Sequence, residues 1–305
     1  MQPTSPDALS GGFKDLPLLS GLADIASSYD VVLSDIWGVV HNGREHFPRA
    51  CEALRRFREG GGTVVLVTNA PRPFPPILQQ LDALGAPRAA FDEIVTSGDV
   101  TLNYIAARGA APLHHIGPER DLTFFDILEE ATGVRPPLVD LNVADYVVCT
   151  GLYNDADTPD TYGDALAAMH ARKLDMICAN PDLVVHVGDH MLYCAGAIAQ
   201  VYEDAGGRVL QAGKPFAPIY DRALELAAKR RGGPIDPRRV VAIGDALRTD
   251  VKGACDKGVD AVFVTTGIHR DELHPAGGAL DVAAMNRLVA EAGVRPIAAI
   301  PTLVW

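Results

Sequence analysis

Short apolar runs alternate with amphipathic stretches along this chain, and several of the runs end directly at polar residues. In the first third, apolar runs at 29–33 and 63–67 enclose a stretch over 48–59 with helical spacing, which stops at three consecutive glycines. Buried strands are typically β-branched runs bounded by turn residues, and glycine commonly ends helices. This segment therefore predicts a strand, a helix and a second strand in succession.

The last third of the chain has the same pattern. Apolar runs at 240–243 and 261–264 enclose a helix-like stretch over 250–256, and a longer helix is predicted from about Phe216 to Arg231. Strands that alternate with helices predict a parallel sheet covered on both faces, in which functional groups gather outside the carboxyl ends of the strands.

The middle of the chain contains a separate set of alternating elements. Residues 145–149 and 175–178 are predicted strands, and 160–172 is predicted to be a helix between them. A second α/β unit at this position in the sequence could fold over the first as a lid.

These patterns together predict the fold class and the division of the chain. We expect an α/β protein with a doubly wound, Rossmann-like parallel-sheet core formed by residues 1–109 and 210–305. An α/β cap domain is predicted as an insertion at 110–209. Residues 1 to about 20, rich in Pro, Ser and Gly, are predicted to be a loose lead-in.

Polar residues suited to phosphate and metal binding stand in four short segments, three of which directly follow a predicted strand. Because the carboxyl ends of parallel strands share one edge of a sheet, the four segments are expected to meet there. They are Asp35-Ile36-Trp37-Gly38, Thr68-Asn69, Gly213-Lys214-Pro215 and Gly244-Asp245-Ala246-Leu247-Arg248-Thr249-Asp250.

Asp35 is the candidate nucleophile, because a carboxylate at a strand end before Gly38 can face a phosphorus atom while backbone N–H groups cradle the phosphoryl oxygens. The alternative is that Asp35 caps the following turn. Thr68 and Asn69 could donate hydrogen bonds to the transferred group, although such residues after a strand are also common turn formers.

Lys214 lies next to Pro215, which suits the first turn of the following helix. A cation at a helix start opposes the helix dipole, so a role in neutralising nucleophile and phosphate charge is favoured over solvent exposure. Asp245 follows a predicted strand and Asp250 enters the predicted helix after it, so both carboxylates can face one hard cation such as Mg²⁺. Asp250 is alternatively an N-cap of that helix.

Composition and charge narrow the classes of partner. The 305 residues, 48% hydrophobic and 22% charged, suffice for one large and one smaller folded domain. A net charge of −12 argues against nucleic acid or an anionic membrane as partner. The five cysteines lack close-pair spacing, so buried free thiols are expected. No secretory signal or run of about 20 apolar residues is evident, which predicts a cytoplasmic protein.

The four segments together resemble the haloacid dehalogenase-like superfamily, over nearly the whole chain. The inserted domain and the segments Ala179-Asn180-Pro181-Asp182 and Ala195-Gly196-Ala197 resemble its class IIA, which contains nitrophenyl-phosphatase-like and pyridoxal-phosphatase-like enzymes. The resemblance implies an aspartyl-phosphate intermediate formed with Mg²⁺ as cofactor. It also allows a homodimer, since cap-mediated dimers occur among similar enzymes, and the sequence itself leaves the oligomeric state open.

The resemblance also implies roles for individual residues. Asp35 would be nucleophile and metal ligand, with the backbone carbonyl of Trp37 and the carboxylate of Asp245 as further ligands. Asp250 would bind metal-held water or orient Lys214. Residues Thr68, Gly38, Asn69 and Asn180 would bind the phosphoryl group or lie near the substrate.

Trp37 departs from the family pattern, in which an aspartate two residues after the nucleophile protonates the leaving alcohol and then activates water. Losing a general acid or base typically costs about 10² to 10⁴ in rate. Backbone coordination of Mg²⁺ does not need that carboxylate, so metal and phosphate binding could survive the change. His41 is a candidate substitute acid, with a plain surface position as the alternative.

Three functions follow from these residues. The first is a Mg²⁺-dependent phosphatase acting on a small phosphorylated metabolite with an acidic leaving group, such as an aryl or acyl phosphate. The second is a catalytically impaired protein that binds a phosphate ester or has a regulatory role. The third is dehalogenation, which the metal-binding residues Asp245 and Asp250 disfavour because halide displacement needs no metal.

Overall fold

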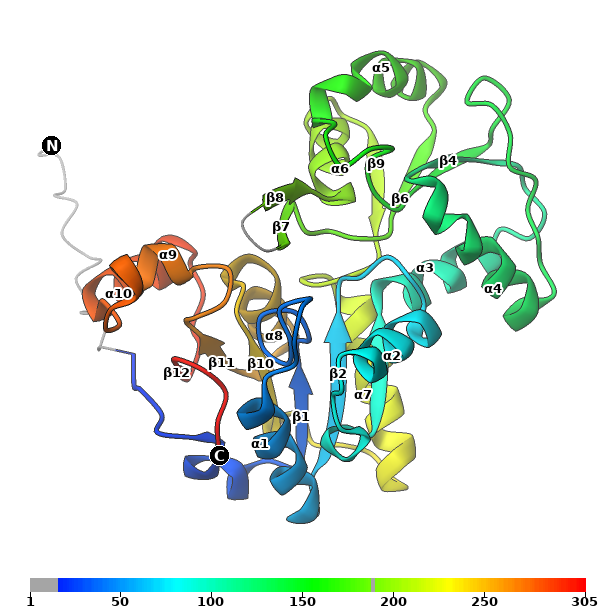
Figure 1. Cartoon of the computed structure of the whole chain (residues 1–305). Coiled ribbons are helices and arrows are strands. Elements are labelled where there is room, and N and C mark those ends of the chain that lie inside the picture. Colours follow the sequence, from blue (N-terminus) through cyan, green and yellow to red (C-terminus); the bar gives the residue numbers. More distant parts are fainter. Residues whose placement is uncertain (1–15, 188–189) are drawn as a thin grey trace, which may run out of the picture.

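A computed structural model describes residues 16–187 and 190–305 and contains two parallel sheets, one above the other in Figure 1. The larger sheet has six strands in the order β12-β11-β10-β1-β2-β3. The bounds of these strands are β1 Val31–Ser34, β2 Thr63–Thr68, β3 Glu93–Thr96, β10 Val240–Gly244, β11 Asp260–Val264 and β12 Ala298–Ile300. The α/β fold class predicted from the sequence is confirmed.

Helices cover both faces of this core sheet, because alternate residues of each buried strand point to opposite faces. Val32, Val64 and Val241 pack on one face with α1 (Pro48–Glu59) and α2 (Phe74–Ala83). The neighbouring strand residues pack on the other face. The helices there are α3 Ser97–Ala106, α7 Ala217–Arg231, α8 Lys252–Lys257 and α10 Val282–Glu291.

The smaller sheet has four parallel strands in the order β4-β5-β6-β9, and we call the segment from Leu113 to Gln211 that contains it the cap. A separate antiparallel hairpin, β7 and β8, follows β6. The cap elements are β4 Leu113–Ile116, α4 Thr123–Thr132, β5 Tyr146–Cys149, α5 Gly163–Arg172, β6 Asp175–Cys178, β7 Val184–Val187, β8 His190–Tyr193, α6 Ala195–Asp204 and β9 Arg208–Gln211. The division at 110 and 209 stays a prediction.

Short turns of helix join these elements. The 3₁₀ turns are η1 Leu22–Asp24, η2 Ala26–Ser28, η3 Arg88–Ala90, η4 Glu119–Leu122, η5 Pro159–Tyr162, η6 Pro237–Arg239 and η8 Pro275–Gly277, and a short α-helix, α9, spans Arg270–Leu273. A π-helical turn, η7, covers Leu247–Val251. No helix within the described ranges is both long and apolar enough to cross a membrane.

Several predicted boundaries are wrong by a few residues. The first strand begins at Val31, because the Tyr29 backbone N–H donates to the Ala26 carbonyl and so closes the preceding 3₁₀ turn. The predicted helix 250–256 is a π turn followed by α8, so Asp250 lies within the turn and is not an N-cap. The long helix begins at Ala217, and Pro218, not Pro215, occupies its first turn.

The lead-in predicted for residues 1 to about 20 lies mostly outside the described residues. Within the described part it is tied to the core, since Leu18 bridges to Ala299 and the Leu19 N–H donates to the Ala299 carbonyl at 2.9 Å. The predicted looseness is therefore wrong for these last residues of the segment.

Candidate active site

The candidate site lies where the strand order of the core sheet reverses. The chain proceeds from β1 through β2 to β3 on one side, and from β10 through β11 to β12 on the other. At such a reversal the loops after the two central strands diverge and leave a crevice. Asp35 directly follows β1 and Asp245 directly follows β10, and the partnered residues Ser34 and Ile243 bring these two loops side by side.

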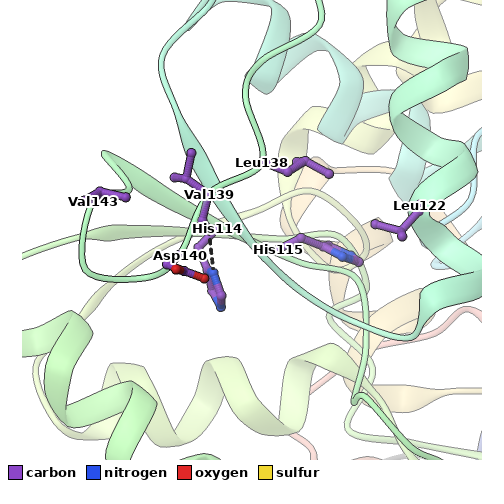
Figure 2. A pocket seen from close by; sticks show the side chains of 7 residues that line it. All are labelled: His114, His115, Leu122, Leu138, Val139, Asp140 and Val143. Atoms are coloured by element: carbon purple, nitrogen blue, oxygen red, sulfur yellow. Dashed lines mark hydrogen bonds between the residues drawn. The ribbon is translucent and has the colours of Figure 1, made fainter.

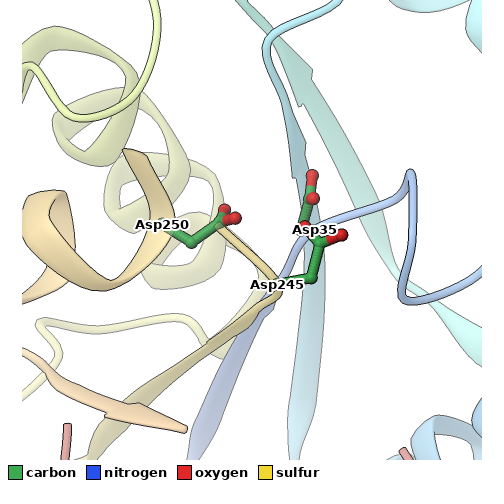
Figure 3. A group of neighbouring side chains, drawn as sticks. All are labelled: Asp35, Asp245 and Asp250. Atoms are coloured by element: carbon green, nitrogen blue, oxygen red, sulfur yellow. The ribbon is translucent and has the colours of Figure 1, made fainter. Parts of the chain in front are cut away.

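Three buried carboxylates converge at this reversal (Figure 3). One oxygen from each of Asp35, Asp245 and Asp250 lies within 4.8 Å of the others. Such a group of oxygen ligands suits a hard divalent cation. Within the described residues it is the only cluster of three His, Cys, Asp or Glu side chains that could hold a metal.

Glycines allow the close approach of these carboxylates. Gly38 has φ +83°, and a Cβ there would lie 2.1 Å from Asp245 Oδ2. A Cβ at Gly244 would lie 2.2 Å from the Asp250 Cβ. Any larger residue at either position would displace a carboxylate, so glycine is required for the geometry of the site.

Lys214 lies between two of the carboxylates. Its Nζ donates to Asp35 Oδ1 at 2.7 Å, to Asp250 Oδ1 at 2.6 Å and to the Val67 carbonyl at 2.9 Å, and the residue is 4% exposed. Burial by itself lowers the pKa of Lys214, but the neighbouring carboxylates of Asp250 and Asp35 outweigh it and raise the pKa. Lys214 therefore stays protonated.

The single positive charge of Lys214 does not neutralise the negative charge of three carboxylates. Burial and then repulsion by Asp250 raise the pKa of Asp35 to about 7. Burial, followed by repulsion from Asp35 and Asp250, raises the pKa of Asp245 well above its usual range. An excess of buried negative charge is relieved by a bound cation, so the residues fit a divalent metal.

The three carboxylates are not equally free to bind that metal. Both oxygens of Asp250 are engaged, Oδ1 by Lys214 and Oδ2 by the Ala246 N–H at 3.1 Å. Of the two Asp245 carboxylate oxygens, only Oδ2 accepts a hydrogen bond, from the Ile268 N–H at 2.8 Å. The hydrogen bonds therefore favour Asp35 and Asp245 as direct ligands, with Asp250 holding Lys214.

The other predicted site residues lie at the same edge in different situations. Thr68 Oγ1 accepts from the Ala70 N–H at 3.2 Å, which leaves the hydroxyl proton to donate. The Gly38 N–H donates to the His41 carbonyl at 2.8 Å and would have to give up that hydrogen bond to reach a phosphoryl oxygen. Asn180 accepts from the Asp182 N–H at 3.0 Å and shapes a turn.

Asn69 is fully engaged by protein partners. Its Oδ1 accepts from the Lys214 N–H at 2.7 Å, and its Nδ2 donates to the Lys214 carbonyl at 3.1 Å and to Asp182 Oδ1 at 2.9 Å. Burial raises the pKa of Asp182 to about 6. Asp182 was overlooked as a site residue, although an acidic residue two positions after Asn180 was a signal in the sequence.

Trp37 and His41 pack against each other in the loop after β1. Their rings meet edge to face with centroids 5.1 Å apart, and the indole also covers Gly43, where a Cβ would lie 2.4 Å from it. His41 is 2% exposed, so its interpretation as a surface residue is wrong. Its Nδ1 accepts from the Gly43 N–H at 3.0 Å, and burial lowers its pKa to about 4, which makes it a poor proton donor at neutral pH.

A hollow of about 590 Å³ lies elsewhere, on the cap beside the edge strand β4 (Figure 2). Its two histidines are already bonded: His114 Nδ1 to the Val139 carbonyl at 2.9 Å and His115 Nε2 to Thr150 Oγ1 at 2.9 Å. No residue of the charged cluster lines it. The lining residues are His114, His115, Leu122, Leu138, Val139, Asp140 and Val143.

Comparisons with known proteins agree with this geometry. Residues 32–130 match the model of the haloacid dehalogenase-like hydrolases, and residues 211–288 match a second model of the same superfamily. An acid sugar phosphatase of Staphylococcus haemolyticus is 29% identical, over 79% of this chain and 87% of its own. A p-nitrophenyl phosphatase of Archaeoglobus fulgidus, 23% identical over 90% of this chain and 97% of its own, has the same fold with a TM-score of 0.68.

A crystal structure of a hydrolase from Brucella suis 1330, described as haloacid dehalogenase-like, is more similar. It is 44% identical and superposes with a TM-score of 0.82 over 94% of this chain and all of the other. The sequence motifs, the sheet order and these matches agree, and the chain belongs to the haloacid dehalogenase-like hydrolase family.

Proposed function

We propose that the protein is a divalent-metal-dependent phosphatase that acts on a small phosphorylated metabolite through Asp35. The observation that carries this proposal is the buried pairing of Asp35 with Lys214 beside two further carboxylates, at the strand-order reversal of the core sheet. Relatives named as phosphatases support the same reaction class.

Asp35 and Asp245 are the proposed metal ligands, together with the backbone carbonyl of Trp37, and Mg²⁺ is the proposed ion. A divalent ion held by these residues would supply positive charge that stabilises the transferred phosphoryl group. Asp35 would then stay ionised at neutral pH, because metal binding displaces the proton that burial otherwise favours.

In the proposed reaction, a carboxylate oxygen of Asp35 attacks phosphorus and the bond from phosphorus to the leaving oxygen breaks. The Lys214 ammonium partly neutralises the charge on Asp35 and on the transferred group, while the Thr68 hydroxyl donates to a phosphoryl oxygen. Water then hydrolyses the acyl phosphate, which releases inorganic phosphate and restores the Asp35 carboxylate.

Neither Trp37 nor His41 is suited to donate a proton to the leaving group. The indole of Trp37 packs on Gly43 and His41 and carries no acidic proton, and the depressed pKa of His41 keeps that ring neutral. Substrates with an acidic leaving group need the least protonation. We therefore propose aryl or acyl phosphates as the preferred substrate class.

The test is release of phosphate from 4-nitrophenyl phosphate and a panel of metabolites, with and without Mg²⁺, by the parent and by Asp35→Asn. Metal-dependent turnover that the substitution abolishes supports the proposal. Absence of turnover by the parent across the panel, including activated esters, would refute it.

A second candidate function is that of a binding or regulatory protein that retains the anion site without turnover. The missing acid at Trp37 favours it. Tight, Mg²⁺-dependent binding of a phosphate ester that remains intact for hours would select this function over the first.

The remaining expectations belong to the same proposal. We propose a cytoplasmic location, a cap that acts as a lid, no nucleic-acid or membrane partner, and a homodimer as the oligomeric state to test by light scattering.

A further inference from the structure

Asn69 contacts the backbone of Lys214 in the way that a neighbouring strand would. Its amide oxygen accepts from the Lys214 N–H at 2.7 Å, and its amide nitrogen donates to the Lys214 carbonyl at 3.1 Å. These two contacts fix which end of the amide is oxygen, because only an oxygen can accept from an N–H. Both backbone groups of Lys214 are thus satisfied by one side chain that is 3% exposed.

The second amide proton of Asn69 is used by the cap. Asp182, in the loop after β6, accepts it at 2.9 Å. The cap loop is itself held close, since a Cβ at Gly196 would lie 2.3 Å from the Pro181 carbonyl oxygen and 2.5 Å from that of Asp182. The position of Asp182, and through it the position of Asn69, is therefore set by the cap.

The space around Asn69 is closed. A Cβ at Gly213 would lie 2.4 Å from Asn69 Oδ1, 2.7 Å from Pro181 and 2.8 Å from Ser97 Oγ. Asn69 cannot turn toward a substrate without giving up hydrogen bonds to Lys214 or Asp182, and leaving buried backbone groups unpaired is costly.

We infer that Asn69 is a positioning residue that aligns Lys214 with Asp35, with Asp182 of the cap holding Asn69 in place, and that it does not bind the substrate. The inference deepens the proposed function and rests on it for its kinetic test. The cap residue Asp182 is thereby connected to the catalytic lysine through a single side chain.

The test reverses the direction of the hydrogen bond between positions 69 and 182. Asn69→Asp places a second carboxylate against Asp182 and against the Lys214 carbonyl. At pH 8 we expect kcat to fall about 10²-fold, the size of loss that follows a small displacement of a catalytic group. KM should change by less than about threefold, because no substrate contact is removed.

Asp182→Asn alone should be milder, about threefold in kcat, since the new amide oxygen still accepts from Asn69, although less strongly than a carboxylate does. In the double variant Asn69→Asp/Asp182→Asn, the amide at 182 donates to the carboxylate at 69, which still accepts from the Lys214 N–H but still faces the Lys214 carbonyl. Because only the repulsion from position 182 is removed, we expect partial recovery, to within about tenfold of the parent.

Two results would overturn the inference: a double variant as slow as Asn69→Asp, or an Asn69→Asp variant whose loss lies in KM with kcat intact. If the parent releases no phosphate, the proposed function fails separately. The same variants are then compared by calorimetry for Mg²⁺-dependent binding of inorganic phosphate, where weakening by Asn69→Asp with recovery in the double variant supports the inference and no recovery refutes it.

Discussion

The core sheet and the cap sheet are both parallel and helix-covered, but their strand orders differ. The order of the core sheet reverses between β1 and β10, whereas the cap sheet runs β4-β5-β6-β9 in one direction. At the reversal, diverging loops leave room for three carboxylates and a lysine. At the carboxyl edge of the cap the loops pack closely, and a Cβ at Gly117 would lie 2.1 Å from Thr150 Oγ1.

The carboxyl ends of the two sheets nevertheless face each other. Lys214 follows the cap strand β9 and reaches Asp35 after β1, while Asp182 follows β6 and reaches Asn69 after β2. The core therefore supplies the charged residues of the site, and the cap supplies the contacts that close it. Four predictions test this division.

The largest effect is expected from Lys214→Met, which leaves the carboxylates of the core crevice without their ammonium. Removing one partner of a buried ion pair typically costs about 3–5 kcal/mol. We expect a loss of this size in the free energy of unfolding, measured by urea titration at pH 8 without metal, and partial recovery with Mg²⁺.

Arg120→Met in the cap, which breaks an exposed pair with Asp155, should cost less than about 1 kcal/mol. Equal losses of unfolding free energy in the two variants would contradict the division of roles between core and cap.

Trp37→Asp introduces the acid that the family resemblance implies at this position. Turnover of an alkyl phosphate, whose leaving group needs a proton, should rise by up to about 10². Turnover of 4-nitrophenyl phosphate should rise much less, because its leaving group is already acidic. Trp37→Asn is the control, because asparagine has nearly the same shape as aspartate but no acidic group. An equal gain in turnover by that variant would assign the effect to loss of the indole.

Stability of the metal-free protein should fall as pH rises through neutrality. Burial gives Asp35 a folded-state pKa of about 7, above its usual value, so the folded protein holds this proton more tightly than the unfolded chain does. The contribution of Asp35 to the free energy of unfolding is therefore fully present below about pH 4 and is lost as pH rises through 7. Mg²⁺ competes with that proton, and its apparent affinity should drop about tenfold per pH unit below 7. Thermal melts at pH 5.5 and 8 check this. A Mg²⁺-induced rise in Tm that is no larger at pH 8 would show that Asp35 is not coupled to the metal.

Tyr220→Phe should give the smallest effect. The Tyr220 hydroxyl, on the helix after Lys214, donates to the Asp250 carbonyl at 3.1 Å and connects that helix to the π turn. Its loss should cost about 1 kcal/mol of stability and, by loosening the pair of Lys214 and Asp250, lower kcat about threefold.

Tyr162→Phe in the cap is the matched control, because Tyr162 is likewise buried and its hydroxyl donates to Asp157 at 3.0 Å and accepts from the Tyr153 N–H at 2.6 Å. It should lower stability similarly and leave kcat unchanged. An equal fall of kcat in both variants would remove the distinction between core and cap.

Sequence periodicity predicted most elements well, since burial on both faces of a parallel sheet produces β-branched runs that end where the strands end. The helix Pro48–Glu59 has the predicted bounds. The π turn at Leu247–Val251 was missed because it departs from the 3.6-residue spacing on which helix prediction depends. It also turns both oxygens of Asp250 toward Lys214 and Ala246, which no residue count predicts.

The sequence alone places Asp35, Thr68 and Asp245 at the ends of core strands, and hence at one edge of the core sheet. Lys214 follows the cap strand β9, which the sequence pattern did not predict. The sequence determined the absence of an acid at position 37 as well. The hydrogen-bond partners of these residues could be identified only in the folded protein, because bonds such as those of Asn69 to Lys214 and Asp182 join residues more than a hundred positions apart. Contacts through backbone groups, like Ile268 N–H to Asp245, carry no signature in the side-chain sequence at all.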